Sequence, residues 1–176
     1  GSTENNTLVR QDYINQGEFT WAQSAKQWIV YHADFTDSLG THKIYPCGEP
    51  NQCPNLFISE YIEGSARETA VEIYNPSAVP VVLNGEYKIR VYNSASSSTV
   101  FETVLDGVIY PNDVFVLSSV GATLSGIVSN TDQLEMYPDY AIFRITGDDA
   151  VALFKGNDTL DMIGKIGTDP GNYWSI

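Results

Sequence analysis

The sequence predicts an all-β fold in which short antiparallel strands form two packed sheets, a β-sandwich. From Asn55 onward, short apolar runs rich in β-branched and aromatic residues alternate with turn clusters at spacings typical of sandwich strands. In one run, Tyr87, Ile89 and Val91 alternate with charged neighbours, so one face of that strand is expected to be wet, as in antiparallel sheets. A length of 176 residues with 43% hydrophobic residues is enough for one sizeable core.

The chain is expected to begin with an irregular N-terminal segment, residues 1–46. Its apolar residues keep no sustained period of two or of 3.6, and only residues 25–33 suggest a short helix or strand. We expect this segment to pack on the sandwich or to belong to an upstream domain. Residues 47–54 follow as a linker, because they combine prolines with both cysteines of the chain. The sandwich is then expected to span residues 55–176.

Turn chemistry separates the expected strands of the sandwich. Asn75-Pro76, Asn84-Gly85 and Asp106-Gly107 each offer a preset φ or tolerance of a positive φ. Residues 120–128 interrupt the β pattern with a helical turn or two. The expected strands are, in order, residues 56–62, 69–74, 87–92, 99–104, 114–118, 141–145, 150–154 and 159–163.

Four motifs in this region follow one another in a recognisable order. They are LFISEYIEGS (56–65), AVEIYNP (70–76), GDDAVAL (147–153), and DMIG with GTDPG (161–164 and 167–171). Together they resemble the lamin-tail domain family in its bacterial form, and the resemblance covers residues 55–174. It implies an immunoglobulin-like β-sandwich that serves as an accessory domain in secreted or surface proteins, often beside nucleases or phosphoesterases. It supplies no catalytic residue.

The charge balance limits the classes of partner. Nine Lys and Arg against 22 Asp and Glu give a net charge of −13, which repels phosphate backbones, so direct nucleic-acid binding is not expected. No run approaches the ~18 apolar residues of a membrane-spanning helix. We therefore expect a protein partner, a neighbouring domain of the same polypeptide, or a glycan.

Cys47 and Cys53 are the candidates for a disulfide. The turn-rich segment between them can bring the two sulfur atoms together. So small a loop contributes only about 2 kcal/mol in the chain-entropy model. Two unpaired thiols are the alternative, since spacing alone does not establish geometry.

Four aspartates near the C-terminus are candidate calcium ligands, because Ca²⁺ takes six to eight oxygen ligands. They are Asp148, Asp149, Asp158 and Asp161. Their spacing is not that of an EF-hand loop. The alternative is that Asp148 or Asp149 caps backbone amides in a tight turn, which is the common role of aspartate in turns. Calcium is the only cofactor that the sequence suggests, and no cofactor is the simpler expectation.

The first two expected strands offer a possible cross-strand carboxylate pair that could act as acid and base, drawn from Glu60, Glu63 and Glu72. Glu60 is expected to share the buried face of Ile58 and Ile62, where a carboxylate needs a partner. The candidate partners are Arg67, Arg90 and Arg144. Glu72 alternates with apolar neighbours and is expected to be solvated.

Tryptophans form the second set of candidate binding residues. Trp21, Trp28 and Trp174, with Tyr137 and Tyr140, could stack on a glycan or a partner protein if exposed. The alternative is packing, with Trp174 closing the end of the sandwich and Trp28 holding the N-terminal segment against it.

The function expected from these observations is that of a non-catalytic accessory or interaction module in an extracellular, cell-surface or periplasmic bacterial protein. A calcium- or glycan-binding module is the alternative. An enzyme is the third and least expected possibility, because the sequence has no nucleophile motif and no phosphate-binding loop. His32 and His42 lack the pattern of a metallohydrolase and are expected to be ordinary surface or packing residues.

Overall fold

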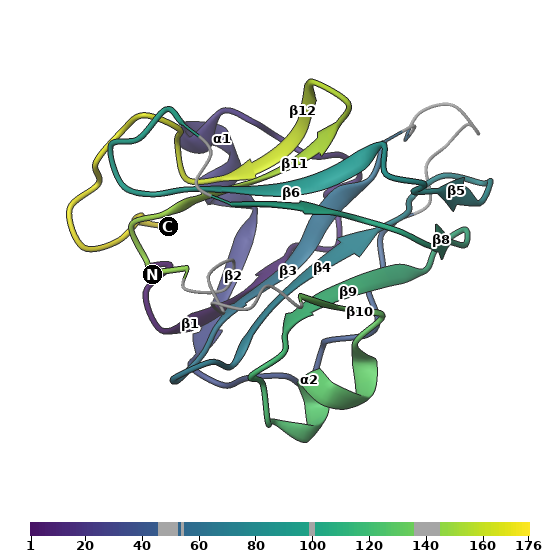
Figure 1. Cartoon of the computed structure of the whole chain (residues 1–176), viewed down its shortest axis with the longest axis horizontal. Coiled ribbons are helices and arrows are strands. Elements are labelled where there is room, and N and C mark those ends of the chain that lie inside the picture. The colour runs from purple at the N-terminus through teal and green to yellow at the C-terminus, as the bar shows by residue number, and fades with distance from the viewer. Residues whose placement is uncertain (46–52, 54, 99–100, 136–144) are drawn as a thin grey trace.

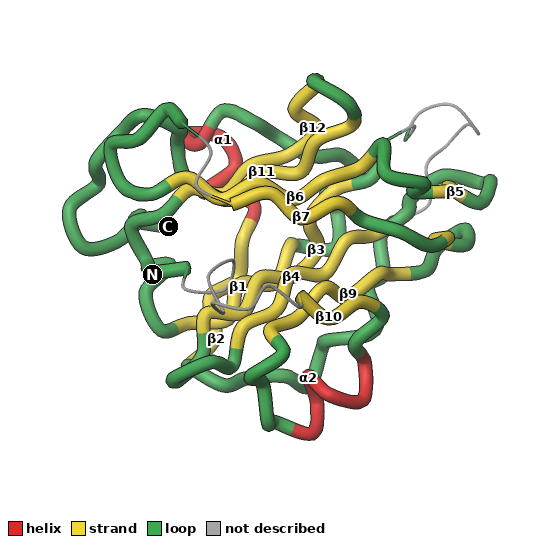
Figure 2. The backbone as a smooth tube through the Cα atoms, in the orientation of Figure 1, coloured by secondary structure: helices red, strands yellow, loops and turns green. Residues whose placement is uncertain are grey.

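The computed structural model describes residues 1–45, 53, 55–98, 101–135 and 145–176. Two β-sheets pack face to face in it (Figures 1 and 2). The larger sheet has the order β10-β9-β4-β3-β1-β2 and the smaller one β12-β11-β6-β7, while β5 and β8 form a two-stranded ribbon. All pairs are antiparallel except β9 with β10, which is parallel. The predicted all-β sandwich is confirmed.

The helices and strands have the following bounds. The six strands of the larger sheet are β1 (Asn6–Arg10), β2 (Trp28–His32), β3 (Phe57–Glu63), β4 (Thr69–Tyr74), β9 (Val114–Ser119) and β10 (Gln133–Glu135). The smaller sheet contains β6 (Tyr87–Tyr92), β7 (Phe101–Val104), β11 (Ala150–Lys155) and β12 (Asp158–Ile163). The remaining elements are β5 (Val81–Val82), β8 (Val108–Ile109), α1 (Trp21–Ser24), η1 (Ala25–Gln27) and α2 (Ser125–Asn130).

The main core lies between the two sheets. The alternation predicted for β6 holds, because Tyr87, Ile89 and Val91 are buried while Lys88 and Arg90 are half-buried. The inward side chains of β3, β4, β9 and β11 complete this core with Leu56, Ile58, Tyr61, Val71, Ile73, Phe115, Leu117, Val151 and Leu153. Burial of apolar surface at ~25 cal/mol per Å² is the main stabilising contribution of such a core.

The N-terminal segment is more regular than expected. β1 lies between β2 and β3 and pairs with both, so it forms an integral part of the larger sheet. The range 25–33 resolves into the short η1 followed by β2. Only Leu8 and Trp28 of these strands enter the main core as fully buried apolar residues, which is too few to produce a readable period.

Three further expectations differ in detail. The helical turn expected over 120–128 lies later, at Ser125–Asn130, because the preceding residues form a loop whose Thr123 and Leu124 amides donate to the Glu68 carboxylate. The short β10 lies outside all of the expected strands. Residues 141–144 of one expected strand, and residues 99–100 at the start of another, lie outside the described residues, as does most of the 47–54 linker.

Candidate functional site

Asp148 and Asp149 cap a turn. Thr146 N donates to Asp149 Oδ2 at 2.8 Å, and Thr146 Oγ1 donates to Asp148 Oδ1 at 2.7 Å. Asp149 is buried, with 6% of its surface exposed, and burial is the main cause that raises the pKa of its carboxyl group. The capping interpretation of this Gly-Asp-Asp turn therefore describes the contacts that are present.

Asp161 forms a buried ion pair with Arg10. Both side chains are fully buried, and Asp161 Oδ2 accepts hydrogen bonds from Arg10 Nη2 and, at 2.8 Å, from Ile58 N. Asp161 Oδ1 accepts from Glu18 N and Met162 N, both at 2.9 Å. Burial lowers the pKa of the Arg10 guanidinium, and the facing carboxylate opposes that change. Both carboxylate oxygens are thus committed to joining β1, β3 and β12.

The four aspartates proposed as calcium ligands are not brought together. Asp158 is exposed at the start of β12, Asp161 is in the ion pair, and Asp148 and Asp149 belong to the separate turn. Within the described ranges, no group of three or more His, Cys, Asp and Glu side chains is arranged to hold a metal ion.

The tryptophans pack inside the protein. Trp28 and Trp174 are each only 5% exposed, and Trp28 belongs to the main core. Trp174 Nε1 donates to Asp149 O at 2.9 Å, and its ring meets the half-buried Trp21 edge-on at 5.8 Å between centroids. Neither buried ring presents a face to a glycan. The other aromatic candidates, Tyr137 and Tyr140, lie outside the described residues.

Cys53 is buried, with 1% of its surface exposed. Cys47 lies outside the described residues. The disulfide between them stays a prediction.

Glu60 and Glu72 do form a cross-strand pair, but on the outer face of the larger sheet. They are register partners on β3 and β4. The expectation that Glu60 shares a face with both isoleucines was wrong, because an irregularity in register between Ile58 and Glu60 turns Ile58 into the main core while Ile62 faces outward. The expectation that Glu72 is solvated was also wrong, since none of its surface is exposed.

The outer face is buried because two segments outside the sheet cover it. The segment after β2 crosses this face, and α2 packs beside it (Figure 1). We call residues 36–40 of this segment the strap. A second, smaller apolar cluster fills the space between the strap, α2 and the sheet and consists of Leu39, Ile62, Ala70, Val116 and Ile127.

The strap is hydrogen-bonded to both glutamates. Ser38 Oγ donates to Glu60 Oε2 at 2.6 Å, and Gly40 N donates to Glu72 Oε2 at 2.7 Å. Ser59 Oγ donates to the other oxygen of Glu72, Oε1, at 2.6 Å. Among the described residues, Glu60 Oε1 is buried without a hydrogen-bond partner. The described partner of Glu60 is thus a serine rather than one of the three candidate arginines. One of these, Arg144, lies outside the described residues.

The pKa values of the two carboxyl groups are raised unequally. Burial raises the pKa of Glu60 to about 8 against the bond from Ser38, and the nearby Glu72 adds to the rise. Burial raises the pKa of Glu72 only to about 6, because Ser59 and Gly40 donate to its carboxylate, although Asp132 opposes them. Near neutral pH the pair therefore holds one proton, on Glu60.

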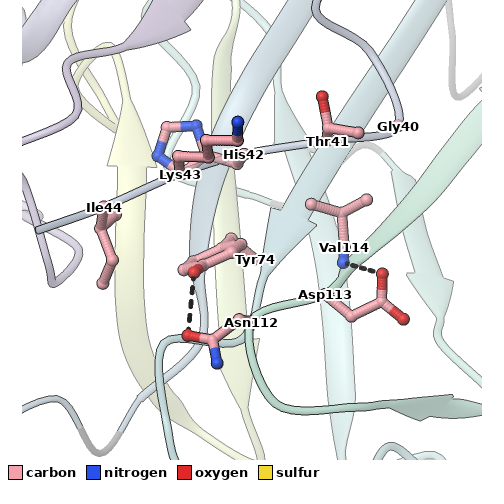
Figure 3. A pocket seen from close by; sticks show the side chains of 9 residues that line it. All are labelled: Gly40, Thr41, His42, Lys43, Ile44, Tyr74, Asn112, Asp113 and Val114. Carbon is pink, nitrogen blue, oxygen red and sulfur yellow. Dashed lines mark hydrogen bonds between the residues drawn. The ribbon is translucent and has the colours of Figure 1, made fainter. Parts of the chain in front are cut away.

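A cavity of about 410 Å³ with a mostly apolar lining lies at one end of the strap (Figure 3). Its walls are formed by residues 40–44 on one side and 112–114 on the other, with Tyr74 between them. The Tyr74 hydroxyl donates to Asn112 Oδ1 at 3.3 Å, and Val114 N donates to Asp113 Oδ1 at 3.0 Å, as the dashed lines show. These polar groups of the described cavity wall are thus hydrogen-bonded to one another.

His42 belongs to the wall of this cavity as a packing residue. Its ring lies edge-on to Tyr74 and Phe57, at 5.1 and 5.9 Å between centroids. Burial is the main cause that lowers the pKa of His42 to about 4, with Arg10 contributing, so the imidazole is neutral near pH 7. Its Nε2 atom is buried and has no partner in the described part of the chain. Because His42 Nε2 is buried, a ligand in the cavity could not reach it. We therefore do not choose this cavity as the candidate site.

The second hollow lies beside α2 and β10, at the edge of the larger sheet. It has a volume of about 540 Å³ and is lined by apolar side chains that are unusually exposed. Val120, Val128 and Leu134 are 43%, 58% and 49% exposed. We call these three residues and the space between them the edge hollow. Sequence reasoning missed it because the three side chains come from a loop, a helix and an edge strand that meet only in the folded chain.

Polar groups at the back of the edge hollow are already hydrogen-bonded. Ser118 Oγ and Thr131 Oγ1 lie 2.7 Å apart, and Val116 N donates to Asp132 Oδ2 at 2.8 Å. What remains available is the apolar surface and the edge of β10, which pairs with β9 alone among the described strands. An apolar hollow next to a strand edge that has no partner among the described strands is suited to contact with another polypeptide.

No model of a known protein family matches the chain, and no curated protein is significantly similar to it. None of the described helices is long and apolar enough to span a lipid bilayer.

Proposed function

We propose that this chain is a non-catalytic interaction module that binds a protein partner through the edge hollow. The observation that carries the proposal is the gathering of Val120, Val128 and Leu134 around one concave space, each more than two-fifths exposed. Single exposed apolar residues are ordinary on protein surfaces, but a contiguous set around a hollow is typical of a contact site. An apolar side chain of the partner would fill the space.

The charge of the chain indicates the chemistry of that partner. The net charge is −13 and Asp132 lines the edge hollow, whereas Glu135 on β10 accepts a bond from Thr103 Oγ1 at 2.6 Å. Arg67 lies against Gly121, next to Val120 of the edge hollow. A segment that alternates apolar with basic side chains would satisfy both the hollow and its surroundings, and an extended segment could also pair with the edge of β10.

The roles of the carboxylates support the non-catalytic part of the proposal. Asp161 and Glu68 accept several hydrogen bonds each and hold distant parts of the chain together, whereas Asp149 accepts bonds from Thr146 within one turn. Three carboxyl groups have clearly raised pKa values. Glu60 and Glu72 lie beneath the strap, and Glu63 is 7% exposed, accepts a bond from the Tyr61 hydroxyl and lines neither of the two hollows described above. An acid or base in catalysis needs access to a substrate proton.

The lamin-tail resemblance and the place in a secreted or surface protein belong to the same proposal. Their chemical test is the state of the two cysteines, since disulfides persist in oxidising compartments. In protein purified without reductant, we expect neither Cys47 nor Cys53 to react with a thiol reagent until the protein is reduced. Two reactive thiols in the unreduced, denatured protein would count against the proposed compartment.

The binding proposal is tested with a defined peptide, acetyl-Lys-Val-Lys-Leu-Lys-Val-amide carrying a fluorophore. We expect it to bind more tightly than a matched peptide with Glu in place of Lys, and more tightly than one with Ser in place of Val and Leu. The double variant V128S/L134S should weaken binding by at least about tenfold, because it removes the equivalent of one buried apolar side chain.

The matched control is V79S, which alters a side chain that is 62% exposed outside the edge hollow. It should bind the basic apolar peptide as the unaltered protein does. Equal affinity for all three peptides, or an equal loss in V79S and V128S/L134S, would refute binding through the edge hollow.

A further inference from the structure

The strap is attached to the sheet by few contacts of its own. Leu39 is its buried apolar residue, and Ser38 and Gly40 supply the hydrogen bonds to Glu60 and Glu72. Inside the strap, Leu39 N donates to Thr36 O at 3.2 Å, and Thr41 N donates to Ser38 O at 3.3 Å. A short segment with so little buried surface can open without unfolding of the sandwich.

The two carboxylates beneath the strap differ in how well their hydrogen-bond donors can stabilise a negative charge. Both oxygens of Glu72 receive donors, so an ionised Glu72 is satisfied. Glu60 receives one donor, from Ser38, and its Oε1 atom is buried without a partner in the described chain. A second negative charge would therefore lie on a poorly solvated oxygen next to the first one.

We propose that the strap is a pH-dependent latch on the outer face of the larger sheet, closed while the Glu60 and Glu72 pair keeps a proton and released as the pair acquires its second charge. Opening would admit water to Glu60 Oε1 and would break the bonds from Ser38 and Gly40. It would also uncover the smaller apolar cluster around Ile62.

The charged groups around the pair reinforce this behaviour. β9 and α2, which pack against the same face, carry no ionisable side chain in their sequences VFVLSS and SGIVSN. Asp132, which follows α2, adds negative potential at Glu72. The covering segment carries an acidic side chain at Asp37 and an exposed basic one at Lys43, and the lowered pKa of His42 leaves its imidazole neutral near pH 7. Arg10, at the end of β1, is committed to Asp161. No described cation is paired with Glu60 or Glu72 to compensate a second charge.

The direction of the pH effect follows from the raised pKa values. In the closed state Glu60 holds its proton up to about pH 8, whereas in an open, hydrated state its pKa returns toward 4.5. The closed strap is therefore most favoured below about pH 4.5, and its opening constant rises by up to about tenfold per pH unit until pH 8, where it levels off. Glu72 contributes only between 4.5 and about 6.

The latch also contacts α2, which borders the edge hollow. Thr36 lies directly against Gly126, and Asn130 lies against Gly40, so close that a Cβ on either glycine would collide with them. Release of the strap would remove both contacts from one side of α2. This adds a pH-dependent element to the chain whether or not the edge hollow binds a partner.

Amide hydrogen exchange followed by NMR tests the latch. The reporters are the amides of Leu39, Gly40 and Thr41, with amides of β11 as an internal reference. After correction for the intrinsic pH dependence of exchange, we expect the protection factors of the reporters to fall by roughly a hundredfold between pH 6 and 8. Those of β11 should remain higher throughout, because their exchange requires global unfolding; they also fall with pH, since global unfolding exposes Glu60 as well.

Two variants separate the latch from general effects of buried carboxylates. E60Q keeps an acceptor for Ser38 and cannot ionise, so its reporters should lose the fall between pH 6 and 8. E63Q is the matched control, because Glu63 is also buried on β3 and its pKa is raised to about 7, yet it bonds to Tyr61 rather than to the strap. Its reporters should behave like those of the unaltered protein.

Three results would overturn the proposal. The first is a constant protection factor at Leu39, Gly40 and Thr41 from pH 6 to 8 in the unaltered protein. The second is an equal fall in E60Q and in the unaltered protein. The third is equal protection factors in the strap and in β11 at every pH, since it would mean that the strap opens only when the whole sandwich unfolds.

Discussion

The E60Q variant is expected to unfold at a higher denaturant concentration than the unaltered protein at pH 8, with a gain of about 2 to 3 kcal/mol. The pKa of Glu60 is about 8 in the folded protein against an ordinary value of 4.5, so the folded state loses stability as pH rises from 4.5 to 8. The full shift corresponds to ~5 kcal/mol at 1.36 kcal/mol per pKa unit. We expect about half of it, since the glutamine amide remains buried with incomplete hydrogen bonding.

Urea unfolding at pH 5 and pH 8 measures this gain. At pH 5 the two proteins should differ little, because the folded protein then carries a protonated Glu60 and the unfolded chain is only partly ionised. E102Q is the control, since Glu102 lies on the surface in ion pairs with Lys88 and Arg90 and its pKa is lowered. That variant should change stability by less than about 1 kcal/mol at either pH. An E60Q protein no more stable than the unaltered one at pH 8 would contradict the account of this pair.

The second large effect is expected at the Arg10 and Asp161 ion pair. Replacement of Asp161 with alanine should destabilise the protein by about 3 to 5 kcal/mol, because it leaves the guanidinium buried and uncompensated. It also removes the acceptor of the Ile58, Glu18 and Met162 amides. The loss should therefore appear as a large fall in the midpoint of urea unfolding at pH 7.

A double-mutant cycle tests whether the charge is the cause. The Arg10 guanidinium lies over the Trp28 ring, 4.0 Å from its centroid. R10M/D161A should be more stable than D161A alone, because methionine fills much of the space beside Trp28 without a charge. The control is K88M, which breaks an exposed ion pair and should cost less than about 1 kcal/mol. If D161A cost no more than K88M, the buried pair would not hold the two sheets as we infer.

The strands that the sequence predicted well are those whose own apolar pattern indicates a buried face. β6 alternates, and β3, β4, β11 and β12 are compact apolar runs bounded by Gly, Asn and Asp turns. β1 escaped prediction because it is stabilised chiefly by pairing with β3, far along the chain, and by Arg10, a residue type that normally indicates surface. For β2, which pairs with β1, the sequence suggested only a short helix or strand over residues 25–33.

The candidate sites were harder to predict because burial on the outer face is a tertiary property. Alternation in β4 places Glu72 opposite the main core, which ordinarily means solvent, but the strap and α2 cover that face. The same limit applies to Asp161, whose partner Arg10 lies at the other end of the chain. A short apolar sequence around α2 gave no signal that its side chains would stay exposed around a hollow.

The most direct test of the proposed interaction function is a residue-level map of where the basic apolar peptide binds. We expect a two-dimensional NMR titration to shift the signals of Val120, Val128 and Leu134, together with the β10 amides, in a saturable manner. Signals at Val79 and along β12 should stay in place. Shifts confined to other surfaces, or no saturable shift at any described residue, would contradict the proposal that the edge hollow is a protein-binding site.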